Sequence, residues 1–170
     1  LRAYFYFNLV RQYGDVPFID HFLSADESNT LSRTPAKDIF DYIISECDDI
    51  KDLIIEDYAN LPADVVLPSE SPETGRVNKA TVLALKARAA LYAASPLFNT
   101  DNNPELWHRA ATANKELLDY CVNERGMKLV SDYASLWDKN NYKNATDELI
   151  FGRRANRESS TMESYNYPVG

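Results

Sequence analysis

Several residue types on which catalytic and cofactor sites depend are scarce in this sequence. Its 170 residues include 5 glycines, 2 cysteines and 2 histidines. The glycines are scattered, so no glycine-rich loop is present to wrap a phosphate group. His21 and His108 stand far apart, and neither has a partner at helical spacing, which argues for solvated side chains and against a metal site. We therefore expect no metal, no cofactor and no nucleotide chemistry.

The two cysteines also offer no nucleophile. Cys47 and Cys121 each fall on the apolar side of a predicted helix, so we expect two buried free thiols rather than a disulfide. Neither lies in a motif that would place a base beside it, and the sequence has no G-x-S-x-G elbow. Carboxylates are plentiful, but sequence alone cannot place two of them across a cleft as a glycosidase requires. We predict that the chain is not an enzyme.

Positive charge and long apolar runs are in short supply as well. The sequence has 18 Lys and Arg against 26 Asp and Glu, a net charge of -8, and this field repels phosphate backbones. Nucleic acid is therefore excluded as a partner. The longest apolar stretch, Thr81 to Ala94, is interrupted by Lys86 and Arg88, and it is shorter than the ~20 residues that cross a bilayer. No segment is expected to span a membrane.

Apolar spacing predicts two helices in the first third of the chain. The first covers Leu1 to Tyr13, is aromatic all round, and should be buried on more than one side; Gly14 ends it, and a loop runs to about Arg33. Thr34 and Pro35 then form the expected start of a second helix, with Thr34 as its cap. Its apolar stripe is Ile39, Ile43, Cys47, Ile50 and Ile54, opposite a solvated face of Asp41, Asp48, Asp49 and Asp52.

The middle of the chain predicts an antiparallel helix pair. One helix runs from a cap at Asn78 to about Ala94, and the other from Asn103 to Gly126. Residues 99–103 are expected to cap the second of these helices rather than to bind calcium. Small side chains on the first helix let a neighbour approach closely. The expected small-residue stripe is Ala80, Ala84, Ala87 and Leu91, and the aromatics assigned to the core are Tyr4, Phe5, Tyr92 and Trp107.

These patterns predict a mainly α, all-α fold of tetratricopeptide-like helix pairs with long irregular loops. Residues 57–75, with three prolines, are an expected exposed connection. A short helix or turn is predicted around Tyr133 to Trp137, followed by a polar loop. Glu148 to Phe151 is predicted to be a short strand, so that at most a short strand or hairpin lies near residues 148–153. The last stretch, from Asn156, is expected to be loop.

Aromatic side chains in the predicted loops are the candidate binding residues. The sequence has 11 Tyr, 7 Phe and 2 Trp, and flat rings can stack on the C–H faces of sugars. Hydroxyl and amide groups beside them would bond the sugar rim. Each ring, taken singly, is more often a partly buried anchor that holds its loop. The candidate ligand-binding residues are Trp137, Tyr142, Arg154, Tyr165 and Tyr167.

Four segments, in order, resemble the SusD/RagB family over nearly the whole chain. They are the Leu1–Val10 helix with Tyr13-Gly14-Asp15-Val16-Pro17, Arg33-Thr34-Pro35 with its aliphatic helix, Gly75-Arg76-Val77-Asn78-Lys79-Ala80 running into the alanine-rich segment, and Glu148–Phe151 with Tyr167-Pro168-Val169-Gly170. The resemblance implies an α-rich fold of tetratricopeptide-like helix pairs whose loops carry the binding site. It also leads us to expect that residues 1–170 are the central fragment of one SusD-like domain, without its lipoprotein signal and C-terminal part.

The same resemblance implies a function. Such proteins are lipid-anchored at the outer membrane, face outward, and deliver oligosaccharides, or in some cases peptides, to a SusC-like TonB-dependent transporter. We therefore expect non-catalytic glycan binding for nutrient uptake, with membrane association only through a lipid anchor outside this fragment. The alternative is a tetratricopeptide-like module that binds a peptide or protein partner. That alternative predicts Asn, Lys and Arg at exposed groove positions of the two middle helices.

Overall fold

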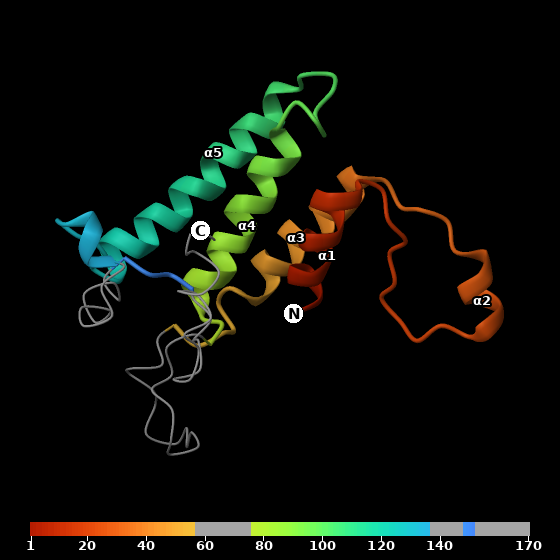
Figure 1. Ribbon diagram of the computed structural model, residues 1–170, viewed down its shortest axis with the longest axis horizontal. Coiled ribbons are helices and arrows are strands. Elements are labelled where there is room, and N and C mark those ends of the chain that lie inside the picture. Colours follow the sequence, from red (N-terminus) through yellow and green to blue (C-terminus); the bar gives the residue numbers. More distant parts are fainter. Residues whose placement is uncertain (57–75, 137–147, 152–170) are drawn as a thin grey trace, which may run out of the picture.

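Four stacked helices form the body of the molecule, and a shorter helix projects from it (Figure 1). The computed structural model describes residues 1–56, 76–136 and 148–151, and the statements below concern these residues. The stack runs in the order α1, α3, α4 and α5, with α4 packed against both α3 and α5. The helices are α1 (Arg2–Tyr13), α2 (Ala25–Thr30), α3 (Ala36–Ile50), α4 (Lys79–Ala94) and α5 (Pro104–Asp119); a π-helical turn (Tyr120–Glu124) and a 3₁₀ turn (Tyr133–Leu136) follow.

Helix α4 is the centre of the stack because most of its residues are small. Its start is fixed by a reciprocal cap in which the Asn78 side chain accepts from the Thr81 backbone N–H and the Thr81 hydroxyl accepts from the Asn78 N–H. The predicted close packing is confirmed: α4 buries eight residues, six of them alanine. The predicted stripe is wrong at its end, since Leu91 is exposed in the last turn of α4. The buried positions of α4 are Ala80, Val82, Leu83, Ala87, Ala89, Ala90, Ala93 and Ala94.

The turn between α4 and α5 is held by its own polar side chains. Asn99 is buried, and its Oδ1 accepts from the Asn103 N–H at 2.8 Å while its Nδ2 donates to the Asn103 carbonyl. Asn103 in turn accepts from the Glu105 N–H at 3.0 Å, and Pro104 begins the helix. The predicted capping role of residues 99–103 is therefore confirmed.

The start of α3 differs from the prediction. Thr34 does not cap the helix, because its backbone instead forms an antiparallel bridge with Val16, donating to the Val16 carbonyl at 3.0 Å. The cap comes from far away in the sequence: Asp15 Oδ1 accepts from the Ala36 N–H at 2.7 Å. The residues that follow α1, Asp15 and Val16, thus contact the residues at the start of α3.

Residues 16–34 form a projecting arm between these two points (Figure 1). The sequence predicted loop throughout, but α2 forms within it, capped by Ser24 and Glu27 in a reciprocal capping box. The Ser-x-x-Glu spacing carried this signal. No residue of α2 is buried. The arm is fastened at its base, where the Tyr6 hydroxyl accepts from the Ile19 N–H at 2.7 Å and the Phe18 ring packs against Tyr6.

Three aromatics assigned to the core are on the surface. Tyr4 and Phe5 lie on the outer face of α1, where Phe5 is 62% exposed, because α3 covers only the opposite face. Trp107 is 42% exposed, since the side of α5 that faces α4 is taken by Ala110 and Ala113. Helix α1 is therefore buried on one side rather than several. Its buried positions are Ala3, Tyr6, Phe7 and Val10, and Tyr92 packs edge-on against Phe7 as predicted for a core ring.

The predicted strand over 148–151 is not formed. Glu148 is in a turn and Ile150 in a bend, Leu149 and Phe151 are irregular, and among the described residues they have no strand with which to pair. Residues 152 and 153 lie outside the described residues. The predicted turn before them is confirmed as the 3₁₀ turn Tyr133–Leu136. In the part of the chain that the structure describes, no helix combines the length and apolarity needed to cross a bilayer.

The long-range cap can be tested by replacing Asp15 with Ala in the complete protein. We expect the Asp15→Ala variant to lose about 1 kcal/mol of unfolding free energy, as is usual when a cap is removed. The matched control is Thr34→Val, which keeps the side-chain shape and should change little. Urea unfolding followed by circular dichroism measures both. A larger loss in the Thr34 variant would contradict this assignment.

The close packing of α4 can be tested by enlarging a buried alanine. Ala89 is fully buried, so Ala89→Leu should force the helices apart and cost about 1–3 kcal/mol. Ala111→Leu, at an exposed alanine of α5, should be within ~0.5 kcal/mol of the wild type. Thermal and urea unfolding of the two variants provide the comparison. Equal unfolding midpoints would show that α4 is not closely packed.

Candidate functional site

The residues predicted to bind ligand lie outside the described residues. This holds for all five, Trp137, Tyr142, Arg154, Tyr165 and Tyr167. Their role stays a prediction. The described residues closest to them in sequence are Leu136 and the segment 148–151.

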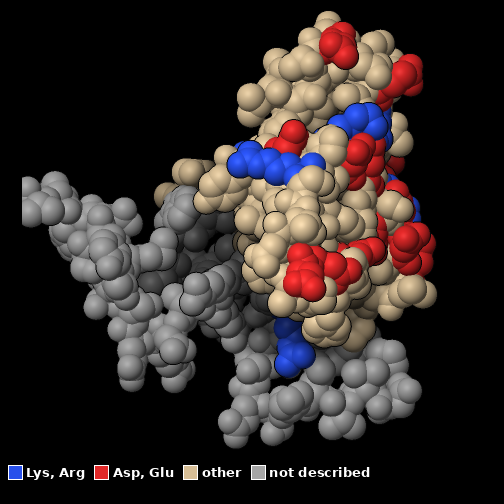
Figure 2. All heavy atoms as spheres, turned by 90° about the vertical axis from the view of Figure 1, so that its right-hand side faces the viewer, with Lys and Arg blue, Asp and Glu red and all other residues tan. Residues whose placement is uncertain are grey.

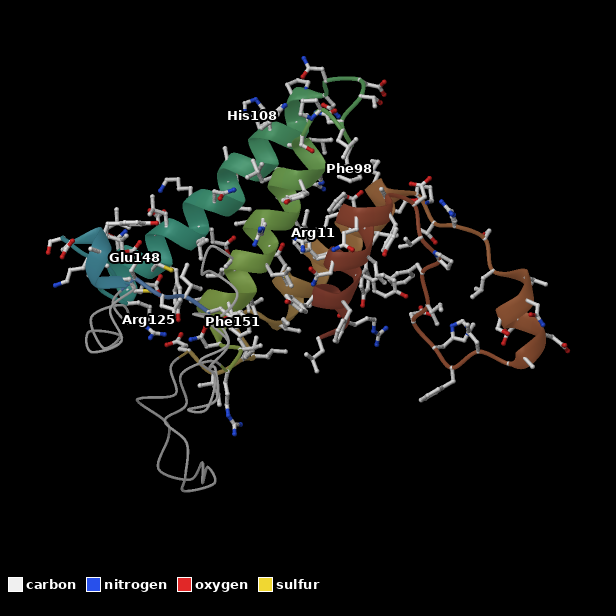
Figure 3. The ribbon with its side chains drawn as sticks, in the orientation of Figure 1. Arg11, Phe98, His108, Arg125, Glu148 and Phe151 are labelled. Carbon is white, nitrogen blue, oxygen red and sulfur yellow. The ribbon has the colours of Figure 1, made fainter. Side chains whose placement is uncertain are left out.

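The segment 148–151 lies at the end of the helix pair where α4 begins and α5 finishes. Figure 3 shows Arg125, Glu148 and Phe151 at this end, and His108 and Phe98 toward the other. The Glu148 carboxylate accepts from the Val130 N–H at 3.0 Å. Ile150 packs against a small cluster that includes Leu83 and Tyr120. The predicted site residues therefore adjoin, in sequence, a segment that lies at this end of the helix pair.

Two hollows open at this end. The smaller has a volume of about 200 Å³ and is lined by Asn78, Arg125 and Ile150, among others. The larger has a volume of about 520 Å³ and lies between the last turn of α3, the first turns of α4 and the last turns of α5. Most of its lining residues are charged or polar, and Leu83 and Tyr120, which also line it, are almost fully buried. We take the larger hollow as the candidate site among the described residues.

Lysines and carboxylates alternate around the larger hollow. Lys79 donates to Asp52 at 3.0 Å, and its Nζ also lies 5.3 Å from the centre of the Tyr120 ring. Lys115 is paired with Asp119 one turn further along α5. Lys79 is 17% exposed at its side chain, so this ammonium group is held in place rather than free in solvent. Each of the three lysines that line the hollow therefore has a carboxylate partner.

A ring of four charges joins α3, α4 and α5 beside the hollow. Lys51 bonds to Asp48 at 2.8 Å and to Glu116 at 2.6 Å, and Lys86 bonds to the same two carboxylates at 2.6 Å each. Each charge thus has two partners of opposite sign. The Lys86 side chain is 11% exposed, so the ring reaches well into the helix interface.

The sequence predicted that the acidic face of α3 is solvated. This prediction is wrong for two of its residues, which form ion pairs with other helices. Asp48 is in the four-charge ring, and Asp41 pairs with Lys37 on its own helix and with Arg109 on α5. The sequence pattern showed that these residues share a helix face but not that two other helices bring lysine and arginine to it. Figure 2 shows acidic and basic side chains interspersed over one face of the molecule.

The ring also shifts the ionisation of its members. Burial alone would raise the pKa of Asp48 and of Glu116, but the hydrogen bonds from Lys51 and Lys86 outweigh it and hold both pKa values below normal. The pKa of Lys51 is raised by its hydrogen bonds to Asp48 and then to Glu116. All three shifts favour the charged forms of Asp48, Glu116 and Lys51 near neutral pH.

The described residues contain neither a reactive thiol nor a metal cluster. Cys47 and Cys121 are both buried and free, as predicted, and burial raises the pKa of Cys47 to about 12 and also raises that of Cys121. No group of three or more His, Cys, Asp or Glu among these residues is arranged to hold a metal ion. His21 and His108 are both exposed, in agreement with the prediction, and His21 pairs with Asp20 in solvent. Thiolate and metal chemistry therefore have no site in this part of the chain.

The fold defines the class of protein as a mainly helical array of stacked helix pairs, and two of three similar solved structures are named SusD-like. A SusD-like protein from Bacteroides fragilis matches with a TM-score of 0.65 over 92% of this chain, at 23% identity. A SusD-like carbohydrate binding protein from the same species matches with a TM-score of 0.55 over 79% of the chain, and surface glycan-binding protein A from Bacteroides uniformis with 0.58 over 88%, both at 23% identity. The chain therefore has a SusD-like fold.

Sequence comparison agrees with this assignment over a shorter segment. A SusD-like protein, P2, from Formosa agariphila is 41% identical over 46 residues, which are 26% of this chain and 9% of that protein. No protein-family model matches. The resemblance to SusD/RagB proteins that the motifs indicated is confirmed. The chain spans only about a quarter of the solved structures, between 22% and 28% of their lengths.

The four-charge ring predicts a defined pH dependence of stability. Because the pKa values of Asp48 and Glu116 are lowered on folding, their contribution is present above their ordinary values of 3.8 and 4.5 and is lost as the pH falls through the folded values. Asp48→Asn should cost about 1 kcal/mol at pH 7 and make the loss of stability on acidification shallower. Asp49→Asn, at the exposed neighbouring position, is the control. Urea unfolding of the complete protein at several pH values measures this, and identical profiles for the two variants would refute it.

Proposed function

We propose that the complete protein captures oligosaccharide at the cell surface without cleaving it. The observation that carries the proposal is the SusD-like fold, shared with two proteins whose names state that they bind carbohydrate or glycan. The described residues fit such a role. Within them the thiols are buried and no metal cluster is formed, while the helix stack is tightly packed around α4.

The proposal extends to the partner and the location. By analogy with the SusD-like proteins, the captured glycan would be passed to a SusC-like TonB-dependent transporter for nutrient uptake. The protein would be held on the outer membrane, facing outward, by a lipid anchor outside residues 1–170. In this arrangement the stacked helices act as a stiff platform, because a closely packed core gives way little when a ligand or a partner docks.

Binding to any one glycan should be modest. A shallow, wet site gains little beyond the free energy that ordering the ligand costs. Modest affinity also suits a protein that must release its ligand to a transporter, since release is governed largely by the dissociation rate.

A peptide-binding module of the tetratricopeptide kind is less well supported. It predicted Asn, Lys and Arg at exposed groove positions of the two middle helices. Two of the lysines on α4, Lys79 and Lys86, are instead largely buried and paired with carboxylates. On α5, Asn114 donates to the carbonyls of Ala87 and Ala110. These side chains are used in holding the helices together.

The proposed function is tested by calorimetry of the complete protein against a panel of oligosaccharides and peptides. We expect binding to at least one oligosaccharide, and loss of about tenfold or more in affinity when Trp137, Tyr165 and Tyr167 are replaced by Ala, since each ring stacks against sugar. The control is Tyr13→Ala, an exposed tyrosine at the end of α1. Reducing ends should not appear when the protein is incubated with polysaccharide.

Two outcomes decide against the proposal. Absence of binding across the whole oligosaccharide panel would refute glycan capture, and peptide binding that survives loss of the three rings would favour the interaction module. Release of reducing ends would make the protein an enzyme.

A further inference from the structure

The larger hollow at the end of the helix pair has the size and the opening of a small-molecule site. Its volume of about 520 Å³ falls within the ~300–1,000 Å³ typical of small-molecule sites. It is open to solvent on one side and walled by three helices, α3, α4 and α5. The hollow can therefore admit a ligand without movement of the helices.

The charges that line the hollow favour a neutral ligand. Its lining contains three lysines and four carboxylates, so a free anion would meet carboxylates and a free cation would meet ammonium groups. A sugar hydroxyl both donates and accepts hydrogen bonds, so it can bond to either kind of group. Hydrogen bonds to charged groups are about twice as strong as neutral ones. A neutral polyhydroxylated ligand thus gains from both without bringing in an unpaired charge.

Several of these groups are held in place before any ligand arrives. Lys51 and Glu116 belong to the four-charge ring, with contacts of 2.6 Å between them. Lys79 is fixed between Asp52 and the Tyr120 ring. Fixed side chains lose less conformational entropy on binding than mobile ones do. The site is preorganised on helices rather than on loops.

The remaining wall supplies a neutral hydroxyl. Thr112, exposed on α5, adds this hydroxyl at the rim. Leu83 and Tyr120 also line the hollow, but they are only 2% and 3% exposed. A ligand in the hollow would therefore be held mainly by hydrogen bonds.

We propose that this hollow, lined by Lys79, Asp52, Thr112, Lys115 and Asp119, is a subsite for uncharged sugar residues of the glycan. The inference rests on the proposed function and adds to it a second place of contact, on the helix platform, and a preference for neutral over acidic sugars. A glycan held by the loop aromatics would then also contact the ends of α4 and α5.

The decisive variant fills the hollow. Thr112→Trp places a large ring at the rim, and Ala111→Trp, at the adjacent exposed position that does not line the hollow, is its matched control. In the complete protein, we expect Thr112→Trp to weaken binding of a neutral oligosaccharide by about tenfold, equivalent to about 1.4 kcal/mol, and Ala111→Trp to leave it unchanged. Isothermal titration calorimetry measures the affinities, and circular dichroism checks that both variants fold.

A second variant tests the subsite independently, in case the first does not fold. Lys115 is on the surface of α5 and pairs with Asp119 on the same helix, so Lys115→Met removes a donor without disturbing the core. We expect it to weaken neutral oligosaccharides several-fold. The panel includes oligosaccharides that carry uronic acids, which should bind more weakly than neutral ones of equal length.

The outcomes separate this inference from the function on which it rests. If the wild-type protein binds oligosaccharide but Thr112→Trp and Lys115→Met bind it equally well, the subsite is refuted and glycan capture stands. Equal binding of uronic-acid and neutral oligosaccharides would overturn the proposed preference. If the wild-type protein binds no oligosaccharide, the proposed function fails and the subsite falls with it.

Discussion

The close approach of α3 and α5 to α4 is the constraint on which the rest of this structure depends. Six alanines are among the eight buried residues of α4, so the neighbouring helices can come near its backbone on two sides. That proximity lets the Lys86 side chain reach Asp48 on α3 and Glu116 on α5 at the same time. With larger residues on α4 the helices would stand apart, and neither the four-charge ring nor the hollow beside it would form.

The same feature explains which parts of the fold the sequence predicts well. Local signals are strong for α4 and α5, where Asn78 and Asn103 are caps and the apolar spacing is regular. The start of α3 was missed because its cap, Asp15, lies 21 residues away and is brought near only by the turn after α1. Helix α2 was missed although its capping box was visible, since no apolar stripe accompanies it. Local caps and apolar spacing could be predicted from the sequence, whereas contacts between residues far apart in the sequence could not.

Exposure was the other property that the sequence could not provide. A helical stripe of aromatics shows that residues share a face, but not whether another element covers it. Phe5 and Trp107 are on faces that no described helix covers, whereas Phe7 and Tyr92 are between helices. The candidate hollow shows the same limit, because Asp52, Lys79 and Asp119 come from three separate helical ends. The loop aromatics were predicted from their place in expected loops beside polar side chains, and they lie outside the described residues.

The bridge between Val16 and Thr34 has a consequence for how this fold can vary. It brings both ends of the intervening segment to a single point on the body, and Asp15 secures that point to the first turn of α3. Lengthening or shortening the segment would therefore leave α1 and α3 where they are. The entropic cost of a longer closed loop rises slowly, by about 0.6 kcal/mol for each doubling. Residues 21–33, beyond the contacts of Phe18 and Ile19 with Tyr6, are thus a place where related proteins can gain or lose sequence without rebuilding the helices.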